Sequence, residues 1–200
     1  MIRSAAAILV AGIAAFGFAN AGEPQKLMLG AAAPNFANLP GVDGKMHALA
    51  EYKNKDVLVI AITCNHCPVA VAYEDRIIDF AKKYTTAPDS KVALVAINVN
   101  NIEQDKLDKM KIRAQQKGFN FPYLYDESQT IARALNARVT PEFYVFNKER
   151  KLVYWGSLDN SQNDPKTNYL TAAVDATLKN QTPGTAKTNA FGCGIKYERK

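Results

Sequence analysis

The chain has 200 residues, an apolar content of 48%, a net charge of +6 and three cysteines. Three cysteines, two of them close together, are too few for a disulfide framework, which excludes a small disulfide-stapled scaffold. The basic residues alternate with acidic ones and no RNA or DNA motif accompanies them, so we expect no nucleic-acid partner.

Residues 1–21 have the pattern of a cleavable signal peptide. Arg3 supplies a positive charge, residues 4–18 are small and apolar, and Ala19-Asn20-Ala21 has the small-x-small form of a signal-peptidase site. A retained membrane anchor is disfavoured because the apolar stretch is shorter than the roughly 20 residues that a spanning helix needs. We therefore predict export to an oxidising compartment, a bacterial periplasm, with no membrane span in the mature chain.

The remaining chain is long enough for one domain with a sizeable core and too short for two. We predict a single domain over residues 22–181. Residues 182–200 follow it as a C-terminal tail, whose first part is polar and favours a flexible or extended segment. Phe191, Ile195 and Tyr197 interrupt that polarity and are candidates for anchoring the tail to the domain.

The hydrophobic period changes several times along the chain, and each change predicts a different element. In the first half of the chain, we expect an N-terminal hairpin within 29–52, a strand at 57–62, a helix ending near Tyr84, a strand at 92–99 and a helix at about 102–117 that Gly118 ends. In the second half, we expect a short strand at 121–125, a short helix at 129–135, a hairpin of strands at 143–146 and 152–155, and a closing helix at 170–178. This order predicts an α/β fold with a mixed sheet between helices.

Cys64-Asn65-His66-Cys67 lies between the first buried strand and the first helix. A Cys-x-x-Cys at such a turn indicates a redox dithiol, because the first cysteine, Cys64, is expected to face the unpaired N–H groups at the helix start, which favour a thiolate. We expect Cys64 to be the exposed nucleophile and Cys67 to resolve the mixed disulfide. Half of a zinc site is the competing interpretation, but no second Cys or Cys/His pair stands at ligand spacing.

Two histidines and one acidic residue receive separate interpretations. His66, between the cysteines, is expected to stabilise the Cys64 thiolate and make the disulfide more oxidising. His47, in the N-terminal hairpin, is interpreted as an ordinary surface residue. Glu74 lies two helical turns beyond the dithiol, and either proton transfer with Cys67 or a solvated position remains open.

Four short motifs together resemble a peroxiredoxin-like (redoxin) group of exported bacterial proteins within the thioredoxin-fold superfamily. They are Cys64-Asn65-His66-Cys67-Pro68, Tyr73-Glu74-Asp75-Arg76, Thr140-Pro141-Glu142-Phe143 and Gly192-Cys193-Gly194-Ile195-Lys196. The resemblance covers residues 29–178 and implies a thioredoxin-like three-layer α/β/α sandwich with a mixed central sheet and an N-terminal β-hairpin extension. It also implies that Pro141 is cis and lies against the dithiol, with the Thr140 backbone pairing with an extended substrate strand.

These features predict a periplasmic thiol–disulfide oxidoreductase that acts on protein thiols or disulfides with a redox partner protein, and without a cofactor or resident metal. A dedicated peroxidase is disfavoured. Peroxiredoxins carry Pro-x-x-x-Thr-x-x-Cys, and alignment on Cys67 puts Ile60 and Cys64 at the Pro and Thr positions. Weak peroxide reduction is kept as an alternative. Binding of a soft metal ion is the other alternative, with Cys64, His66, Cys67 and Cys193 as ligands.

Cys193 is an odd cysteine in a chain predicted to be exported, and its thiol is flanked by Gly192 and Gly194. One interpretation is a small buried residue that docks the tail against the domain. The other is a third thiol that exchanges with Cys64 or Cys67. The sequence leaves both open.

Overall fold

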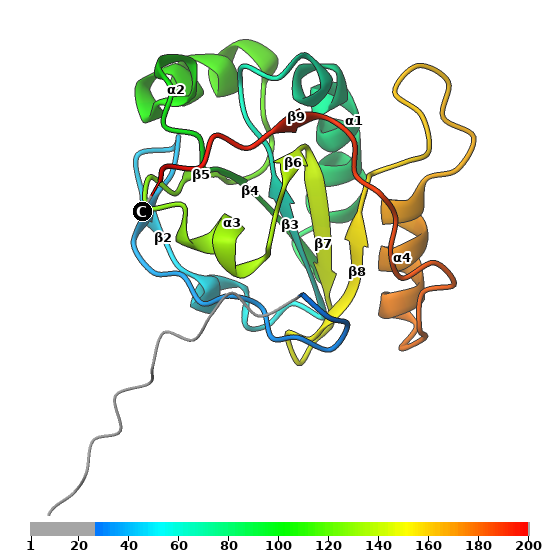
Figure 1. The fold of residues 1–200 in the computed structure, drawn as a ribbon. Coiled ribbons are helices and arrows are strands. Elements are labelled where there is room, and N and C mark those ends of the chain that lie inside the picture. Colours follow the sequence, from blue (N-terminus) through cyan, green and yellow to red (C-terminus); the bar gives the residue numbers. More distant parts are fainter. Residues whose placement is uncertain (1–26, 200) are drawn as a thin grey trace, which may run out of the picture.

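The computed structural model describes residues 27–199, so the predicted signal peptide lies outside the described residues. A five-stranded mixed sheet forms the centre of the protein (Figure 1). Its strands, in spatial order, are β5 (Tyr123–Tyr125), β4 (Val92–Asn98), β3 (Val57–Ile62), β7 (Glu142–Phe146) and β8 (Leu152–Gly156). The first three are parallel to one another, β7 runs antiparallel to β3, and β8 runs antiparallel to β7 and so parallel to β3. All six residues of β3 are buried, as its unbroken apolar sequence predicts for a strand covered on both faces.

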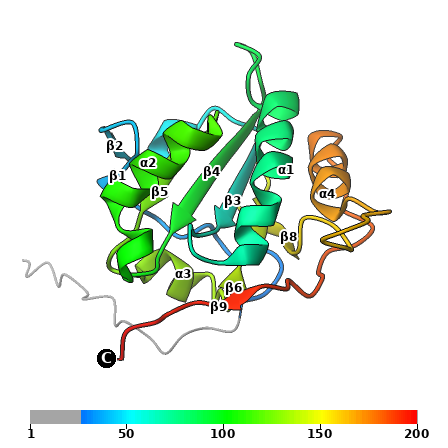
Figure 2. The same ribbon diagram turned by 90° about the horizontal axis from the view of Figure 1, so that it is seen from above.

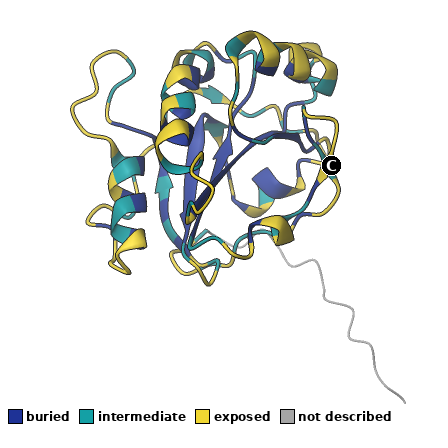
Figure 3. Cartoon of the chain, turned by 180° about the vertical axis from the view of Figure 1, so that it is seen from behind, coloured by how far each residue is buried: buried dark blue, intermediate teal, exposed yellow. Residues whose placement is uncertain are grey.

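Helices cover both faces of this sheet and make three layers (Figures 2 and 3). One face packs against α1 (Pro68–Tyr84), α2 (Leu107–Lys117) and α4 (Tyr169–Leu178). The other packs against α3 (Thr130–Ala134) and the 3-10 helix η1 (Leu49–Tyr52). Alternate residues of β3 point to opposite faces: Val59 joins the first core, and Ile60 joins the second. Among residues 27–199, none of the helices combines the length and the hydropathy that a membrane-spanning segment requires.

The predicted elements are present with small changes in their ends. The N-terminal hairpin consists of β1 (Leu39–Pro40) and β2 (Met46–His47). The helix expected at about 102–117 is divided into the 3-10 helix η2 (Glu103–Asp105) and α2, because the extended backbone of Lys106 separates them. Gly118 ends α2 in the left-handed conformation at φ 67°, as a glycine just past a helix is expected to do.

A second, smaller pairing lies outside the main sheet and was not predicted as an element of this chain. The strands β6 (Val139–Thr140) and β9 (Cys193–Gly194) pair antiparallel. The tail follows an extended path across the start of α1 to this pairing and continues past α3 (Figure 1). The ring of Phe191 meets that of Tyr73 edge-on at 5.9 Å, and Ile195 packs against the second core. The C-terminal tail is therefore extended and docked on the domain.

Candidate active site

The dithiol lies where β3 ends and α1 begins. The helix starts at Pro68, which occupies the first helical position, so the capping residue is Cys67. The backbone N–H of Ala70 points to the sulfur of Cys67 at 3.5 Å. The expectation that Cys64 faces the helix N-terminus is therefore wrong. Pro68 fixes the first helical residue, and Cys64 stands three residues before the cap.

The two thiols are both buried, with exposed fractions of 3% for Cys64 and 0% for Cys67. The exposure expected for Cys64 is thus absent. Burial raises the pKa of Cys64 to about 12, and the nearby carboxylate of Asp105 adds to the effect. A hydrogen bond with the Thr140 hydroxyl, at 3.0 Å from the Cys64 sulfur, offsets only part of this. Cys64 therefore holds its proton.

Cys67 has the opposite acidity. Burial disfavours its thiolate, but hydrogen bonds from the Cys193 thiol and from the backbone N–H groups of Ala70 and Cys193 outweigh burial and lower the pKa of Cys67. In its protonated form, Cys67 donates to the carbonyl oxygen of Thr140 at 3.2 Å. Of the two cysteines in the motif, Cys67 is therefore the more acidic.

The loop before β7 supplies the wall of the site. The Thr140–Pro141 peptide bond is cis, as the family resemblance implies. The side chain of Thr140 contacts the sulfur of Cys64, and its carbonyl oxygen contacts the sulfur of Cys67. The backbone position expected to pair with a substrate strand is taken by the chain itself, because Thr140 is in register with Cys193 of β9.

His66 is held by a buried carboxylate that the sequence analysis did not identify. The Nδ1 atom of His66 pairs with the carboxylate of Asp105, whose side chain is fully buried. Asp105 also accepts the backbone N–H of Asn65 at 2.7 Å and the side-chain amide of Asn98 at 3.1 Å. Asp105 lies in η2, 39 residues from His66 in the chain. No local pattern marked it, because an acidic residue in a polar loop is ordinarily solvated.

One group of potential metal ligands occurs at this site. The sulfur of Cys64, a ring nitrogen of His66 and a carboxylate oxygen of Asp105 all lie within 4.8 Å of one another. A thiolate, an imidazole and a carboxylate suit Zn²⁺. The grouping differs from the one considered from the sequence, because Asp105 replaces Cys67 and Cys193 as the third ligand.

Cys193 lies directly against Cys67. Its backbone N–H points to the Cys67 sulfur at 3.3 Å. The hydrogen bond to Cys67 raises the pKa of the Cys193 thiol to about 11, with burial adding to the shift. The Cys193 thiol is thus less acidic than the Cys67 thiol. All three cysteines are free thiols, so the structure describes the reduced protein.

Two other residues discussed from the sequence occupy structural positions. Both carboxylate oxygens of Glu74 accept from the guanidinium of Arg113, at 2.8 and 2.6 Å, which ties α1 to α2. Glu74 is therefore buried in an ion pair with Arg113 and is not a solvated helix residue. His47 is only 9% exposed and its ring nitrogens meet the carboxylates of Asp43 and Glu51. The interpretation of His47 as a surface residue is wrong, because packing places two acidic partners around it.

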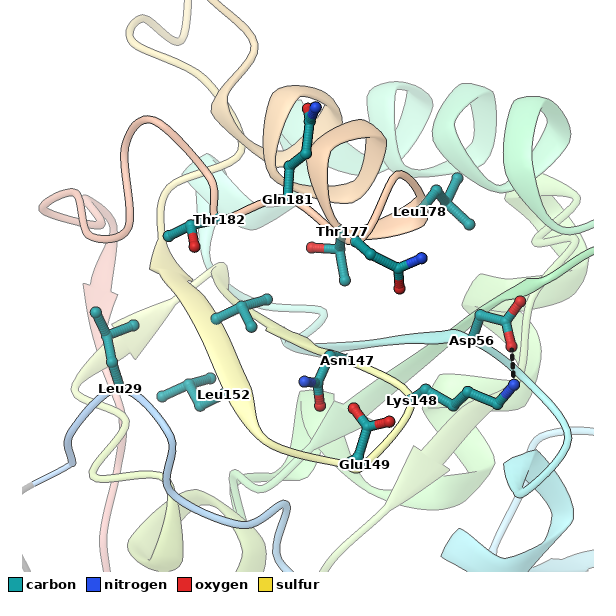
Figure 4. Close-up of a pocket in the computed structure, with 12 residues that line it drawn as sticks. Leu29, Asp56, Asn147, Lys148, Glu149, Leu152, Thr177, Leu178, Gln181 and Thr182 are labelled. Atoms are coloured by element: carbon teal, nitrogen blue, oxygen red, sulfur yellow. Dashed lines mark ion pairs between the residues drawn. The ribbon is translucent and has the colours of Figure 1, made fainter.

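A cavity of about 440 Å³ opens at the other end of the sheet (Figure 4). It lies beside the start of β3, the turn between β7 and β8, and the end of α4. Its lining includes Leu29, Asp56, Lys148, Glu149, Thr177 and Leu178, with an ion pair between Lys148 and Asp56 at 3.4 Å. No cysteine or histidine lines it.

Comparisons with known proteins agree with this arrangement. A family model described as Redoxin matches residues 28–172. A hypothetical protein from Sinorhizobium meliloti has 34% identity and a TM-score of 0.80, over 88% of this chain and 98% of its own. A conserved protein from Geobacillus kaustophilus has 36% identity and the same TM-score, over 88% and 95%.

A more distant structure shows the fold alone. The exposed lipoprotein thioredoxin of Streptococcus pneumoniae is 22% identical with a TM-score of 0.55, over 73% of this chain and 99% of its own. It confirms the expected thioredoxin-like fold. A comparison with curated proteins found no match.

Proposed function

From the premise that this chain belongs to the redoxin family, we propose that it is a thiol–disulfide oxidoreductase that acts through Cys64 and Cys67 in the periplasm. The observation that carries the proposal is the contrast between two adjacent thiols, one with a raised pKa and one with a lowered pKa, beside Thr140. One thiolate and one retained proton are what disulfide exchange requires. The pattern of residues 1–21 supports export.

The acidities indicate which sulfur attacks. We assign the attacking thiolate to Cys67 and the resolving thiol to Cys64, the reverse of the order expected from the sequence. The Cys67 thiolate attacks one sulfur of a substrate disulfide, which forms a mixed disulfide and releases the other sulfur as a thiolate. Cys64 then gives up its proton and attacks the Cys67 sulfur. The substrate sulfur that was bonded to Cys67 leaves as a thiolate. The Cys64–Cys67 disulfide remains, and the substrate is reduced by two electrons.

A redox partner protein with its own dithiol would reduce the Cys64–Cys67 disulfide by the same steps in reverse. The direction in which electrons flow through the cycle depends on the reduction potential of this disulfide. A potential near about −270 mV would make the protein a reductant of protein disulfides, and one near about −120 mV an oxidant of protein thiols.

Trapping the mixed disulfide tests the proposal. In Cys64→Ser combined with Cys193→Ser, the attacking thiolate is kept and both thiols that could resolve at Cys67 are lost, so the variant should accumulate a mixed disulfide through Cys67 with an insulin substrate. Cys67→Ser should trap none. The opposite result would give the attacking role to Cys64, and a wild-type protein that exchanges disulfides with neither insulin nor a reduced protein would reject the function.

Slow peroxide reduction is a second candidate, favoured by the position of Cys67 at the helix N-terminus. The Cys67 thiolate would attack the peroxide, yielding a sulfenic acid and an alcohol or water. The Cys64 thiol would then condense with the sulfenic acid to a disulfide and release water. Among the described residues, no arginine side chain hydrogen-bonds to Cys67 or Cys64, so we expect much slower peroxide turnover than disulfide exchange. Parallel assays of both reactions compare the two rates.

Zinc binding is a third candidate, favoured by the group of Cys64, His66 and Asp105. It predicts one Zn²⁺ per chain in protein purified anaerobically, and loss of that ion in Asp105→Asn. Metal-free protein that does not take up Zn²⁺ on titration would exclude this candidate. Its failure leaves the exchange function intact.

A further inference from the structure

The C-terminal tail lies in the site as an extended peptide bound through its backbone. Cys193 is paired with Thr140, and the N–H of Ile195 donates to the carbonyl oxygen of Arg138 at 3.0 Å. The next N–H, of Lys196, donates to the side-chain oxygen of Asn100 at 2.7 Å. Backbone groups are common to every sequence, so these contacts suit an extended polypeptide in general.

Gln129 continues the same contacts beyond the paired strands. Its side-chain amide donates to the carbonyl oxygen of Lys196 at 2.9 Å and accepts the N–H of Glu198 at 2.8 Å. Gln129 is only 1% exposed and adopts a left-handed backbone at φ 60°, so it is fixed in this position. Arg133 adds a bond to the carbonyl oxygen of Glu198 at 2.7 Å. We call Asn100, Gln129, Arg133, Arg138 and Thr140 the peptide groove.

Alternate side chains of the tail face the domain, as in any extended strand. Cys193 faces Cys67, Ile195 packs against the second core, and the hydroxyl of Tyr197 donates to the carbonyl oxygen of Ala137 at 2.8 Å. The guanidinium of Arg133 also stacks over the Tyr197 ring at 4.5 Å. The groove thus fits a cysteine followed by an apolar residue at the second position and an aromatic residue at the fourth.

The residue before the cysteine is restricted to glycine. Gly192 has φ 155°, and a Cβ atom added there would lie 2.0 Å from the carbonyl oxygen of Thr140. Any other residue would displace the strand from Thr140. Gly194, on the other side of the cysteine, has no such restriction, because the nearest atom to an added Cβ is 4.0 Å away.

We propose that the peptide groove binds an extended polypeptide with a Gly-Cys-x-apolar sequence, and that residues 191–198 occupy it as a tethered substrate. The inference rests on the proposed function, because it adds the substrate class and the regulation of the same dithiol. A polypeptide substrate reaches Cys67 only after the tail has left, so the tail competes with substrates of the site.

Cys193 also takes part in the chemistry of the oxidised protein. When Cys64 and Cys67 are joined, the Cys193 thiolate attacks the Cys67 sulfur. The Cys67–Cys193 bond forms, the Cys64–Cys67 bond breaks, and Cys64 takes up a proton equivalent to the one that Cys193 lost. The exchange moves a disulfide within the chain and needs no oxidant or reductant. In the reduced protein, the backbone N–H of Cys193 lies 3.3 Å from the Cys67 sulfur and the Cys193 side chain packs against the two cysteines of the motif, so the reacting groups are adjacent.

Gly192→Ala and its matched control Gly194→Ala test the docking. The rate at which Cys193 is alkylated in the reduced full-length protein is measured by peptide mapping. It should be at least tenfold higher in Gly192→Ala than in wild type, because the added Cβ displaces the tail from Thr140 and exposes the Cys193 thiol. It should be unchanged in Gly194→Ala. Tyr197→Ala loosens the tail from the groove without adding a clash at Thr140, and should also accelerate the reaction. Equal rates in all four proteins would overturn the tethering.

A synthetic peptide of residues 189–199 carrying Cys193→Ser tests the groove itself. The peptide should bind Gly192→Ala protein, whose groove is open, and should not bind wild type or Gly194→Ala. The same peptide with Gly192→Ala should bind none of them. Equal binding of both peptides would overturn the glycine requirement. These measurements do not use disulfide exchange, so an inactive dithiol with a docked tail would reject the proposed function alone.

Discussion

The two ends of the five-stranded sheet differ in what they enclose. At the end where β3 runs into α1, the sulfurs of Cys64 and Cys67 are buried under Thr140 and the tail. At the other end, about 440 Å³ of open space lies between β3, the β7–β8 turn and α4, without a cysteine or histidine in its lining. We call these the filled end and the hollow end. The proposed dithiol chemistry lies at the filled end, and no cysteine or histidine lines the cavity at the hollow end.

The difference follows from what each end must stabilise. A thiolate inside a protein needs hydrogen-bond donors close to the sulfur, and a helix N-terminus and a docked strand provide them at Cys67. Such contacts place protein atoms directly against the sulfur. The exposed ion pair between Asp56 and Lys148 needs no such enclosure, since water solvates both charges.

The largest expected effect is on activity at the filled end. Cys67→Ser removes the proposed attacking thiolate and should lower insulin reduction by roughly a thousandfold or more, as loss of a nucleophile commonly does. Leu178→Ala at the cavity should leave the rate within about twofold of wild type, because that side chain is far from the reacting sulfurs. A comparable loss in Leu178→Ala would contradict the contrast between the two ends.

A second effect concerns stability and acidity at the filled end. Asp105→Asn removes a fully buried carboxylate that holds His66 and Asn65, and should lower the free energy of unfolding by about 2 kcal/mol in a urea titration. The same change removes a negative charge that raises the pKa of Cys64, so that pKa should fall. Thiolate absorbance measured in Asp105→Asn, with wild type as the control, checks this. An unchanged Cys64 titration would show that burial alone sets its acidity.

The pH dependence of the reduced protein should reveal the acidity of Cys67. Its pKa is lowered in the folded state, so the thiolate stabilises the fold above the ordinary value of 9.0 and this contribution is lost as pH falls through the lowered pKa. The alkylation rate of Cys67 in Cys64→Ser should therefore rise with pH, with a midpoint below the ordinary value of 9.0. A midpoint above 9.0 would assign the thiolate to another sulfur.

The smallest expected effect is at the hollow end. Lys148 is 70% exposed in its pair with Asp56, so Lys148→Ala should change the free energy of unfolding by less than about 0.5 kcal/mol. The same urea titration as for Asp105→Asn measures it. A loss as large as that of Asp105→Asn would mean that the cavity end stabilises the fold more than its exposure suggests.

The sequence by itself determined the elements and the location of the dithiol. Val57 to Ile62 is an apolar run that only a strand covered on both faces explains, and Pro68 begins the helix that follows. Cys64 and Cys67 are placed between these elements by chain connectivity alone. The cis bond at Pro141 and a pairing of Thr140 with a substrate strand came from the family resemblance, since neither has a local signal, whereas the pairing of Thr140 with Cys193 was not predicted.

Only the tertiary structure decided which residues surround the dithiol. Asp105 reaches His66 across 39 residues, and Cys193 reaches Cys67 across 126. Asp105 is an ordinary acidic residue in its own segment, and the sequence left open whether Cys193 returns to the dithiol. The role of each depends on which segment packs beside it. The acidities of the two cysteines follow from those partners, because a buried thiol is charged or neutral according to the donors and charges that packing brings to its sulfur.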